Sequence, residues 1–213
     1  MSPPPTEPLP PVHPIEAESY RILAERVDLS AWPPRARAVV ARVIHAAADV
    51  GYAETLVVGE AACAAGVAAL RSGAPVVADV DMVAVASRRA GTRSLLAEGR
   101  ERVAADRAAV PDLTVSAAAM RVAAERWPCG AVVVVGNAPT ALREVVSLAA
   151  AGGFAPALVI GLPVGFVGAA EAKVDLRASG LPAISNVGER GGSAVAAAAL
   201  NALWRLAQEE DPA

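Results

Sequence analysis

Three side chains within "RVIHAAADV" could together carry out proton transfer next to an anion. On a helix, Arg42, His45 and Asp49 lie on one side, because they are spaced i, i+3 and i+7. An imidazole can take up and release a proton while a carboxylate holds its orientation, and a guanidinium can bind an acidic ligand. The spacing alone also fits a solvated helix face with a modest Asp49–His45 pair, so this alternative stays open.

Two other short segments carry candidate groups. Asp79 and Asp81 in "ADVDMV" lie on the same side of an extended segment. They could act as an acid and a base, or they could only form a turn at the end of a strand. The "SYR" segment places Ser19 and Arg21 near the first helix, and these residues alone assign no function to it.

Three segments rich in glycine, asparagine and proline follow buried strands: "GNAPT" (136–140), "GLPVGFVG" (161–168) and "NVGERGGS" (186–193). Ligands of open parallel sheets bind at the carboxyl ends of the strands, where free helix N–H groups favour anions. Together the segments predict a pocket for carboxylates or phosphates, although each alone fits ordinary turn chemistry. They contain neither a complete GxGxxG pattern nor a GxxxxGK[ST] pattern, so nucleotide binding is weakly supported.

The elements that must position these groups alternate along the chain. Helices are expected over 15–27 and 32–50, and strands occur in "TLVVG", "APVVADV" and "AVVVV". Continuous valine and isoleucine runs without alternation are typical of strands that are buried on both faces. Strands that alternate with helices predict right-handed crossovers and an α/β fold around a mostly parallel, doubly wound sheet.

Composition narrows the range of functions. The first 14 residues hold seven prolines and are expected to form a flexible leader, followed by a single α/β domain over 15–208 and a short tail over 209–213. A net charge of −3 without a basic patch argues against nucleic acid, and no apolar run is long enough for a membrane. Cys63 and Cys129 have no metal-ligand spacing, which predicts no metal site and fits the cytoplasm.

A series of motifs resembles the precorrin-8X methylmutase family. In order, these are "ESYRI", "VARVIHAAADV", "GAPVVADVDMV", "SAAAM", "VVGNAPTAL", "GLPVGFVGAAEAK" and "GERGGSAVAAAALNAL", and the likeness extends from about Pro14 to about Leu203. The resemblance implies a three-layer α/β sandwich, a homodimer with sites near the subunit interface, and a role in cobalamin biosynthesis. It implies an isomerase that moves a methyl group from C-11 to C-12 of a precorrin macrocycle, giving hydrogenobyrinate without a cofactor or metal.

The resemblance also implies roles for individual residues. His45 corresponds to the catalytic histidine that donates and accepts a proton, and Ser19 and Arg42 correspond to substrate contacts. With the loops, the predicted substrate-binding residues are Ser19, Arg21, Arg42, Asp79, Gly136, Asn137, Thr140, Gly161, Gly165, Gly191, Gly192 and Ser193. The substrate is expected to be precorrin-8X or cobalt-precorrin-8, between which the sequence does not decide.

One departure from the family pattern keeps a second function in view. Val115 stands where the family has an arginine, so a charge that could bind a carboxylate is missing, and Arg93 and Arg121 are candidates to replace it. The alternative is therefore a non-catalytic corrinoid-binding protein that has lost turnover. A nucleotide-dependent enzyme of the Rossmann type is the third and weakest hypothesis.

Overall fold

The computed structural model describes residues 13–106 and 110–209 of the chain. Most of the expected leader, residues 1–12, lies outside the described residues, as do residues 210–213 of the expected tail. The first helix, α1 (Pro14–Arg26), begins at a proline, whose fixed φ suits the first turn. The His13 side chain accepts a hydrogen bond from the Ile15 N–H and so caps this helix.

A six-stranded sheet forms the middle of the molecule, with strand order β1-β6-β5-β4-β2-β3. All neighbouring strands are parallel except β1, which runs antiparallel to β6. The strands are β1 (Leu56–Val58), β2 (Val76–Ala78), β3 (Arg93–Ser94), β4 (Val132–Val135), β5 (Leu158–Gly161) and β6 (Ala183–Asn186). Every residue of β4 and β5 is buried, as the unbroken apolar runs predict for strands covered on both faces.

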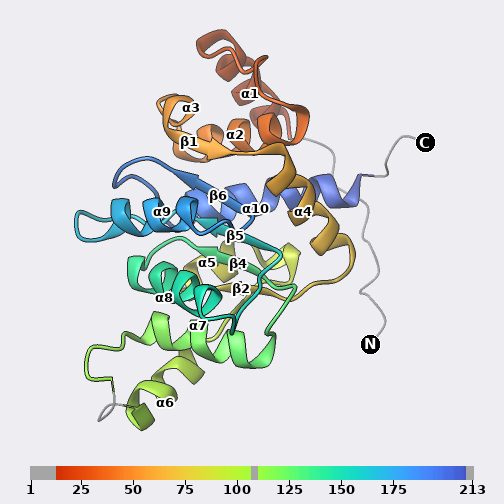
Figure 1. The fold of residues 1–213 in the computed structure, drawn as a ribbon. Helices are drawn as coiled ribbons and strands as arrows, with labels where there is room; N and C mark the ends of the chain where they lie inside the picture. Colours follow the sequence, from red (N-terminus) through yellow and green to blue (C-terminus); the bar gives the residue numbers. More distant parts are fainter. Residues whose placement is uncertain (1–12, 107–109, 210–213) are drawn as a thin grey trace.

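Helices cover both faces, which confirms the predicted α/β sandwich (Figure 1). Alternate strand residues divide between the two sides: Val132 and Val134 pack in one core, and Val133 and Val135 pack in the other. The first core contains residues of α2 (Pro34–Ala47), α4 (Glu60–Arg71), α5 (Asp81–Ala86) and α10 (Ser193–Gln208). The second contains residues of α7 (Val115–Arg126), α8 (Pro139–Ala150) and α9 (Ala169–Ala178).

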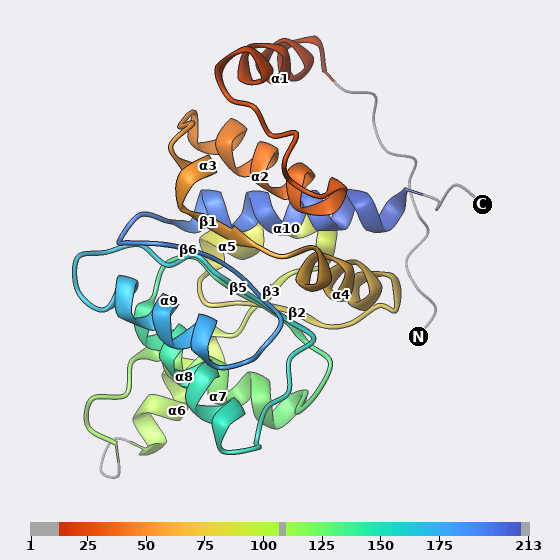
Figure 2. The same ribbon diagram turned by 45° about the horizontal axis from the view of Figure 1, so that its top comes forward.

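The remaining helices lie outside these layers. In Figures 1 and 2, α1 packs on the outer side of α2, and α6 (Leu96–Asp106) packs on α7 at the opposite end of the molecule. Two short helices, α3 (Tyr52–Thr55) and η1 (Arg88–Ala90), connect larger elements. The strands β4, β5 and β6 are neighbours in the sheet, so the three glycine-rich loops at their carboxyl ends lie next to one another.

The second helix ends earlier than the sequence predicts. It was expected to continue to Val50, but α2 ends at Ala47 and Ala48 adopts a left-handed conformation with φ of 52°. Asp49 and Val50 therefore lie in a turn, and the Val50 side chain is 42% exposed. A left-handed residue is a common end of a helix, but alanine rarely adopts it, so no sequence signal marked this position.

Candidate active site

Two residues of α1 hold the ring of His45. The Oγ atom of Ser19 and the Nδ1 atom of His45 are 2.7 Å apart, which is a hydrogen bond between two half-buried residues. The ring of Tyr20 stacks on the imidazole, with 5.1 Å between the ring centroids and 19° between the planes. Because Nδ1 is occupied and no side chain of the described residues bonds to Nε2, Nε2 is the nitrogen that can exchange a proton with a ligand.

Arg42 lies one turn before His45 on α2 and also contacts α1. Its guanidinium forms an ion pair with Glu16 and donates a hydrogen bond to the Tyr20 hydroxyl at 3.4 Å. Burial lowers the pKa of Arg42, but the interactions with Tyr20 and Glu16 outweigh it and raise the pKa above its usual value. The structure thus brings Ser19, Arg42 and His45 together, with a charged Arg42 that Glu16 partly neutralises.

Arg21 lies on a different side of α1. Residues two apart on a helix differ in direction by about 200°, so Arg21 points away from Ser19. Its guanidinium pairs with Glu18 at 2.8 Å and also with Glu25, and all three side chains are more than half exposed. The structure therefore does not bring Arg21 together with His45.

Asp49 contacts a distant loop and not the histidine. Its carboxylate forms an ion pair with Arg190 and accepts a hydrogen bond from the Gly51 N–H at 2.9 Å. The guanidinium of Arg190 also lies over the ring of Tyr52, 4.4 Å from its centroid. The group that orients His45 is therefore a hydroxyl of α1, whereas Asp49 joins the end of α2 to the loop between β6 and α10.

Asp79 is buried directly after β2 and binds the loop between β4 and α8. Its carboxylate accepts hydrogen bonds from the N–H groups of Gly136, Asn137 and Ala138 at 3.0, 2.8 and 2.7 Å. Burial raises the pKa of Asp79, and these amide donors oppose that shift. Asp79 and Asp81 have different surroundings, because Asp81 is exposed at the start of α5. The N–H groups of Gly136 and Asn137 bond to Asp79 within the protein and not to a ligand.

Several contacts join the three glycine-rich loops. A Cβ atom at Gly136 would lie 2.8 Å from the Cα atom of Ser193, so only glycine permits this approach to the start of α10. The N–H group of Gly192 donates to the Leu162 carbonyl at 2.9 Å, and that of Gly165 donates to the Glu189 carbonyl at 3.1 Å. The structure thus brings residues of all three predicted loops together at one edge of the sheet.

The other predicted loop residues serve local packing. A Cβ atom at Gly161 would press on the side chain of Leu142 at 3.0 Å, and one at Gly191 would overlap the carbonyl oxygen of Leu162. The hydroxyl of Thr140 lies 2.8 Å from that of Thr114, which caps α7. These contacts explain why small or hydroxylated residues occupy the positions, independently of any ligand.

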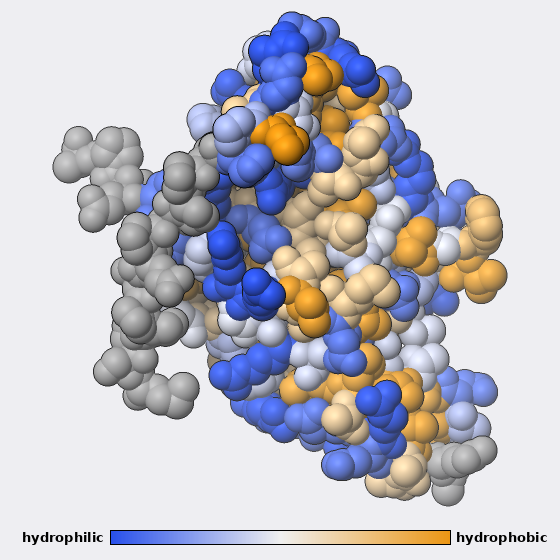
Figure 3. Space-filling view, turned by 180° about the vertical axis from the view of Figure 1, so that it is seen from behind, coloured by the Kyte–Doolittle hydropathy of each residue, from blue (hydrophilic) through white to orange (hydrophobic). Residues whose placement is uncertain are grey.

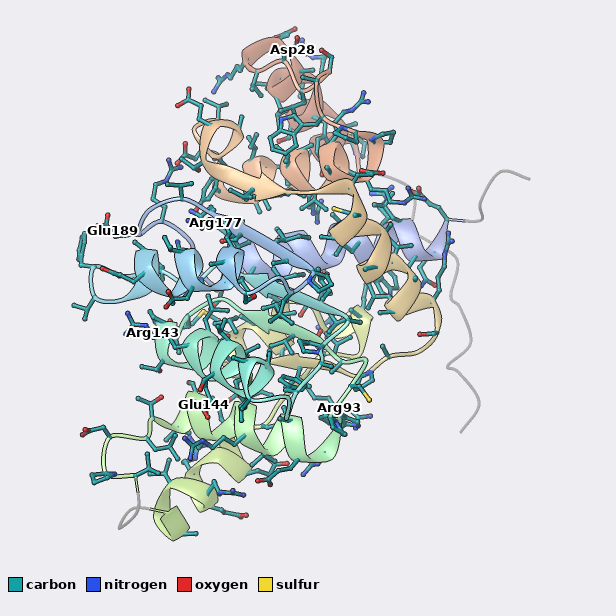
Figure 4. All side chains as sticks on the ribbon, in the orientation of Figure 1. Asp28, Arg93, Arg143, Glu144, Arg177 and Glu189 are labelled. Atoms are coloured by element: carbon teal, nitrogen blue, oxygen red, sulfur yellow. The ribbon has the colours of Figure 1, made fainter. Side chains whose placement is uncertain are left out.

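The first residue of α7 is Val115, on the face of the sheet opposite α2. Arg93 and Arg121 are the candidates to replace the family arginine that is missing at position 115, and neither of them lies beside His45. Arg121 pairs with Glu144 of α8 at 2.7 Å. Arg93 belongs to β3, at the sheet edge opposite β1 and α2, and Figure 4 shows it far from the α2 end of the molecule.

Lys173 is a buried residue near the site that sequence reasoning did not select. Its side chain on α9 is fully buried, and its Nζ atom donates to Asn186 Oδ1 at 2.9 Å and to the Arg190 carbonyl at 2.7 Å. Burial, and to a smaller extent the charge of Arg177, lower the pKa of Lys173 to about 8. Lys173 is the only lysine among the 19 basic residues of the sequence, and it ends the segment "GLPVGFVGAAEAK". This signal could have selected the residue, but only the three-dimensional contacts show its surroundings.

Two shallow hollows, with volumes of about 480 and 290 Å³, lie along α7 and α8, and His45 lines neither of them.

Within residues 13–106 and 110–209, no group of three or more histidine, cysteine, aspartate or glutamate side chains could hold a metal ion. None of the helices in the same ranges has the length and apolar character that crossing a membrane requires.

Comparison with known proteins identifies the family. The sequence model of the family described as "Precorrin-8X methylmutase" matches residues 14–206. The chain belongs to the precorrin-8X methylmutase family. Its relatives include the precorrin-8X methylmutase of Pseudomonas aeruginosa, which is 42% identical over 89% of this chain and 93% of that protein. The cobalt-precorrin-8 methylmutase of Priestia megaterium is 38% identical over 91% of this chain and 87% of that protein.

The fold of this methylmutase also matches a solved structure. The crystal structure of precorrin-8x methyl mutase from Thermus thermophilus superposes with a TM-score of 0.80 and is 39% identical, covering 91% of this chain and 95% of that one. The resemblance seen in the sequence motifs is thereby confirmed, and the protein is an isomerase of the methylmutase type. None of these relatives is named as a non-catalytic corrinoid-binding protein.

Proposed function

We propose that this methylmutase moves a methyl group from C-11 to C-12 of precorrin-8X or cobalt-precorrin-8, giving hydrogenobyrinate or its cobalt form. The observation that carries the proposal is the hydrogen bond between Ser19 and Nδ1 of His45, within a chain of this family. In the reaction one carbon–carbon bond breaks and another forms inside the same macrocycle. Atoms and electrons therefore balance without an external group donor, oxidant or reductant.

His45 supplies the proton transfer that such a shift needs. A protonated imidazole gives its Nε2 proton to the macrocycle, which fixes the protonation state in which the methyl group migrates. The remaining Nδ1–H donates to the Ser19 oxygen at 2.7 Å, so the proton is retained at Nδ1 and Nε2 is free to take a proton back. The stacked Tyr20 ring limits rotation of the imidazole during this cycle.

The substrate combines an apolar ring with several carboxylates, and the surroundings of His45 suit both. Arg42 is charged and half-buried one turn away, where it can exchange Glu16 for a substrate carboxylate. In the loops at the edge of the sheet, a Cβ atom at Gly165, Gly188 or Gly192 would meet nothing within 4 Å, so the backbone there leaves room for a flat ligand.

We also propose that the protein acts as a homodimer in the cytoplasm. His45 lines neither hollow of the single chain, and Val115 lies on the other face of the sheet. Large apolar side chains are exposed, including Phe166 at 93% and Val167 at 89%, and Figure 3 shows hydrophobic groups on the rear face of the molecule. Light scattering should give twice the chain mass of 21.5 kDa, and a monomeric mass at working concentration would contradict this proposal.

The catalytic role is tested by His45→Ala. Turnover of precorrin-8X, followed by the colour change on forming hydrogenobyrinate, should fall by about 100- to 10,000-fold, the usual contribution of a general acid–base group. Product binding should change little, because the imidazole moves a proton and does not anchor the ligand. His13→Asn is the matched control, since it changes the other histidine and keeps a capping side chain on α1.

The two hypotheses differ in the unmodified protein. An isomerase converts precorrin-8X, whereas a corrinoid-binding protein binds hydrogenobyrinate tightly and shows no turnover. An active His45→Ala variant would refute the role assigned to the histidine, and tight binding without turnover in the unmodified protein would refute the proposed reaction.

A further inference from the structure

A buried positive charge lies beneath the loop between β6 and α10. Lys173 has no solvent exposure, and both of its hydrogen-bond partners are neutral oxygens, those of Asn186 and of the Arg190 backbone. Burying an ammonium group whose hydrogen bonds go only to neutral oxygens is costly. The nearby Glu189 carboxylate offsets part of this cost, but burial and the charge of Arg177 still lower the pKa of Lys173. Neither packing nor the proton transfer at His45 accounts for a charged group at this position.

The partners of Lys173 form one end of a continuous relay. The Arg190 carbonyl accepts from Lys173 and also from the Asn186 side-chain amide at 2.8 Å. Arg177, one turn further along α9, donates to the Asn186 carbonyl at 2.8 Å, and Figure 4 shows Arg177 beside this loop and Glu189 within it. Two cations of α9 therefore fix the backbone at the end of β6.

The other end of the relay reaches α2. The Arg190 side chain forms an ion pair with Asp49 and lies over Tyr52, and the Asp49 N–H donates to the Ile44 carbonyl at 3.3 Å. Asp49 therefore closes the turn that ends α2, one helical turn after His45. A shift of the loop at Arg190 would be transmitted to this turn by a charged pair and a backbone hydrogen bond.

We propose that Lys173 is a positioning residue, whose ammonium group fixes residues 186–192 so that Arg190 and Asp49 hold the end of α2 and the ring of His45 in the reactive arrangement. The proposal rests on the proposed function of His45. If Lys173 only stabilised the fold, replacing it would lower the melting temperature without changing the environment of the His45 ring in the folded protein.

The test uses the fact that the chain has only two histidines. In a His13→Asn background, the imidazole ring signals in a ¹⁵N–¹H NMR spectrum belong to His45 alone, are distinct from the indole signals of the three tryptophans, and can be followed without substrate. Lys173→Met keeps the length of the side chain and removes the charge and the donors, so we expect displaced His45 ring signals. We also expect kcat to be 10- to 100-fold lower and KM to change less than 3-fold, because the reacting group and not the binding surface is displaced.

Two further variants sharpen the test. Asp49→Asn removes the charge at the partly exposed far end of the relay, and it should displace the same ring signals and lower kcat by a smaller factor. In the double variant, the loss in kcat should be smaller than the product of the single losses, because both changes interrupt one relay. Glu171→Gln, an exposed change on the same helix, is the control and should leave the ring signals and kcat unaltered.

Unchanged ring signals and kcat in folded Lys173→Met would overturn the proposal, as would independent, multiplying losses in the double variant. If Lys173→Met does not fold, Lys173→Gln, which keeps an amide donor, is judged by the same readouts. The NMR readout needs no turnover, so it separates this proposal from the previous one. Displaced ring signals together with an active His45→Ala variant would leave the relay in place and refute only the catalytic role of His45.

Discussion

At the scale of single residues, the arrangement of His45 depends on a hydroxyl and an aromatic ring. Ser19 bonds to Nδ1 at 2.7 Å and Tyr20 stacks on the ring, and both come from one turn of α1. A hydroxyl orients an imidazole without adding a full negative charge beside it. This arrangement is compatible with the proton donor and acceptor role that we propose for His45.

Ser19→Ala tests this arrangement. Loss of the hydrogen bond should cost about 1 kcal/mol of stability and lower kcat by roughly 10- to 100-fold, because the ring is no longer held with its proton at Nδ1. Ser19→Thr keeps the hydroxyl and should recover most of the activity. Ser147→Ala, on the exposed side of α8, is the control in steady-state kinetics, and a Ser19→Ala variant with unaltered kcat would contradict the tautomer argument.

Residue spacing predicted part of this site. The i, i+3 relation of Arg42 and His45 placed both on one helix, and in the structure both contact α1. The orienting partner could not be found in this way, because Ser19 lies 26 residues before His45 and on another helix. The sequence therefore offered Asp49, four residues away, as the nearest group of suitable chemistry.

At the scale of elements, apolar runs and glycines predicted most of the fold. The run "AVVVV" predicted β4 as a strand buried on both faces, and this is confirmed. The end of α2 was predicted wrongly, because the turn that ends it is held by an ion pair between Asp49 and Arg190, which are 141 positions apart in the sequence. Local propensity cannot report such a contact.

The loop between β4 and α8 also depends on a contact that is distant in the sequence. Three N–H groups of this loop donate to the carboxylate of Asp79, which lies 57 to 59 residues earlier in the chain. The pattern "ADVDMV" suggested a carboxylate pair on one strand, but β2 ends at Ala78 and α5 begins at Asp81. Two aspartates two residues apart therefore have different surroundings, one buried among N–H groups and one exposed.

At the scale of the whole molecule, polar contacts join the two faces of the sheet around its carboxyl edge. Lys173 belongs to α9 on one face, and Asp49 follows α2 on the other face. The loop that holds Arg190 passes between them and contacts both. Lys173, at one end of these contacts, is fully buried. The free energy of unfolding of the whole protein should therefore depend on whether Lys173 is protonated.

The pH dependence of unfolding tests this expectation. In the folded protein burial lowers the pKa of Lys173 to about 8, whereas its ordinary value is 10.5. Below pH 8 the lysine is charged in both states, so the folded state bears the full cost of the buried charge. Between these two values the unfolded chain binds more protons, so the free energy of unfolding rises with pH.

The difference in the free energy of unfolding between the unmodified protein and Lys173→Met is the quantity to measure. From pH 7 to pH 10 this difference should rise by about 2–3 kcal/mol, at 1.36 kcal/mol per pKa unit. Using the difference cancels the titration of other groups, and urea unfolding at several pH values provides both curves. A difference that stays flat or falls with pH would mean that the lysine remains protonated through this range. The Glu189 carboxylate, which favours the charged form, would then outweigh the burial and the charge of Arg177 that lower the pKa of Lys173.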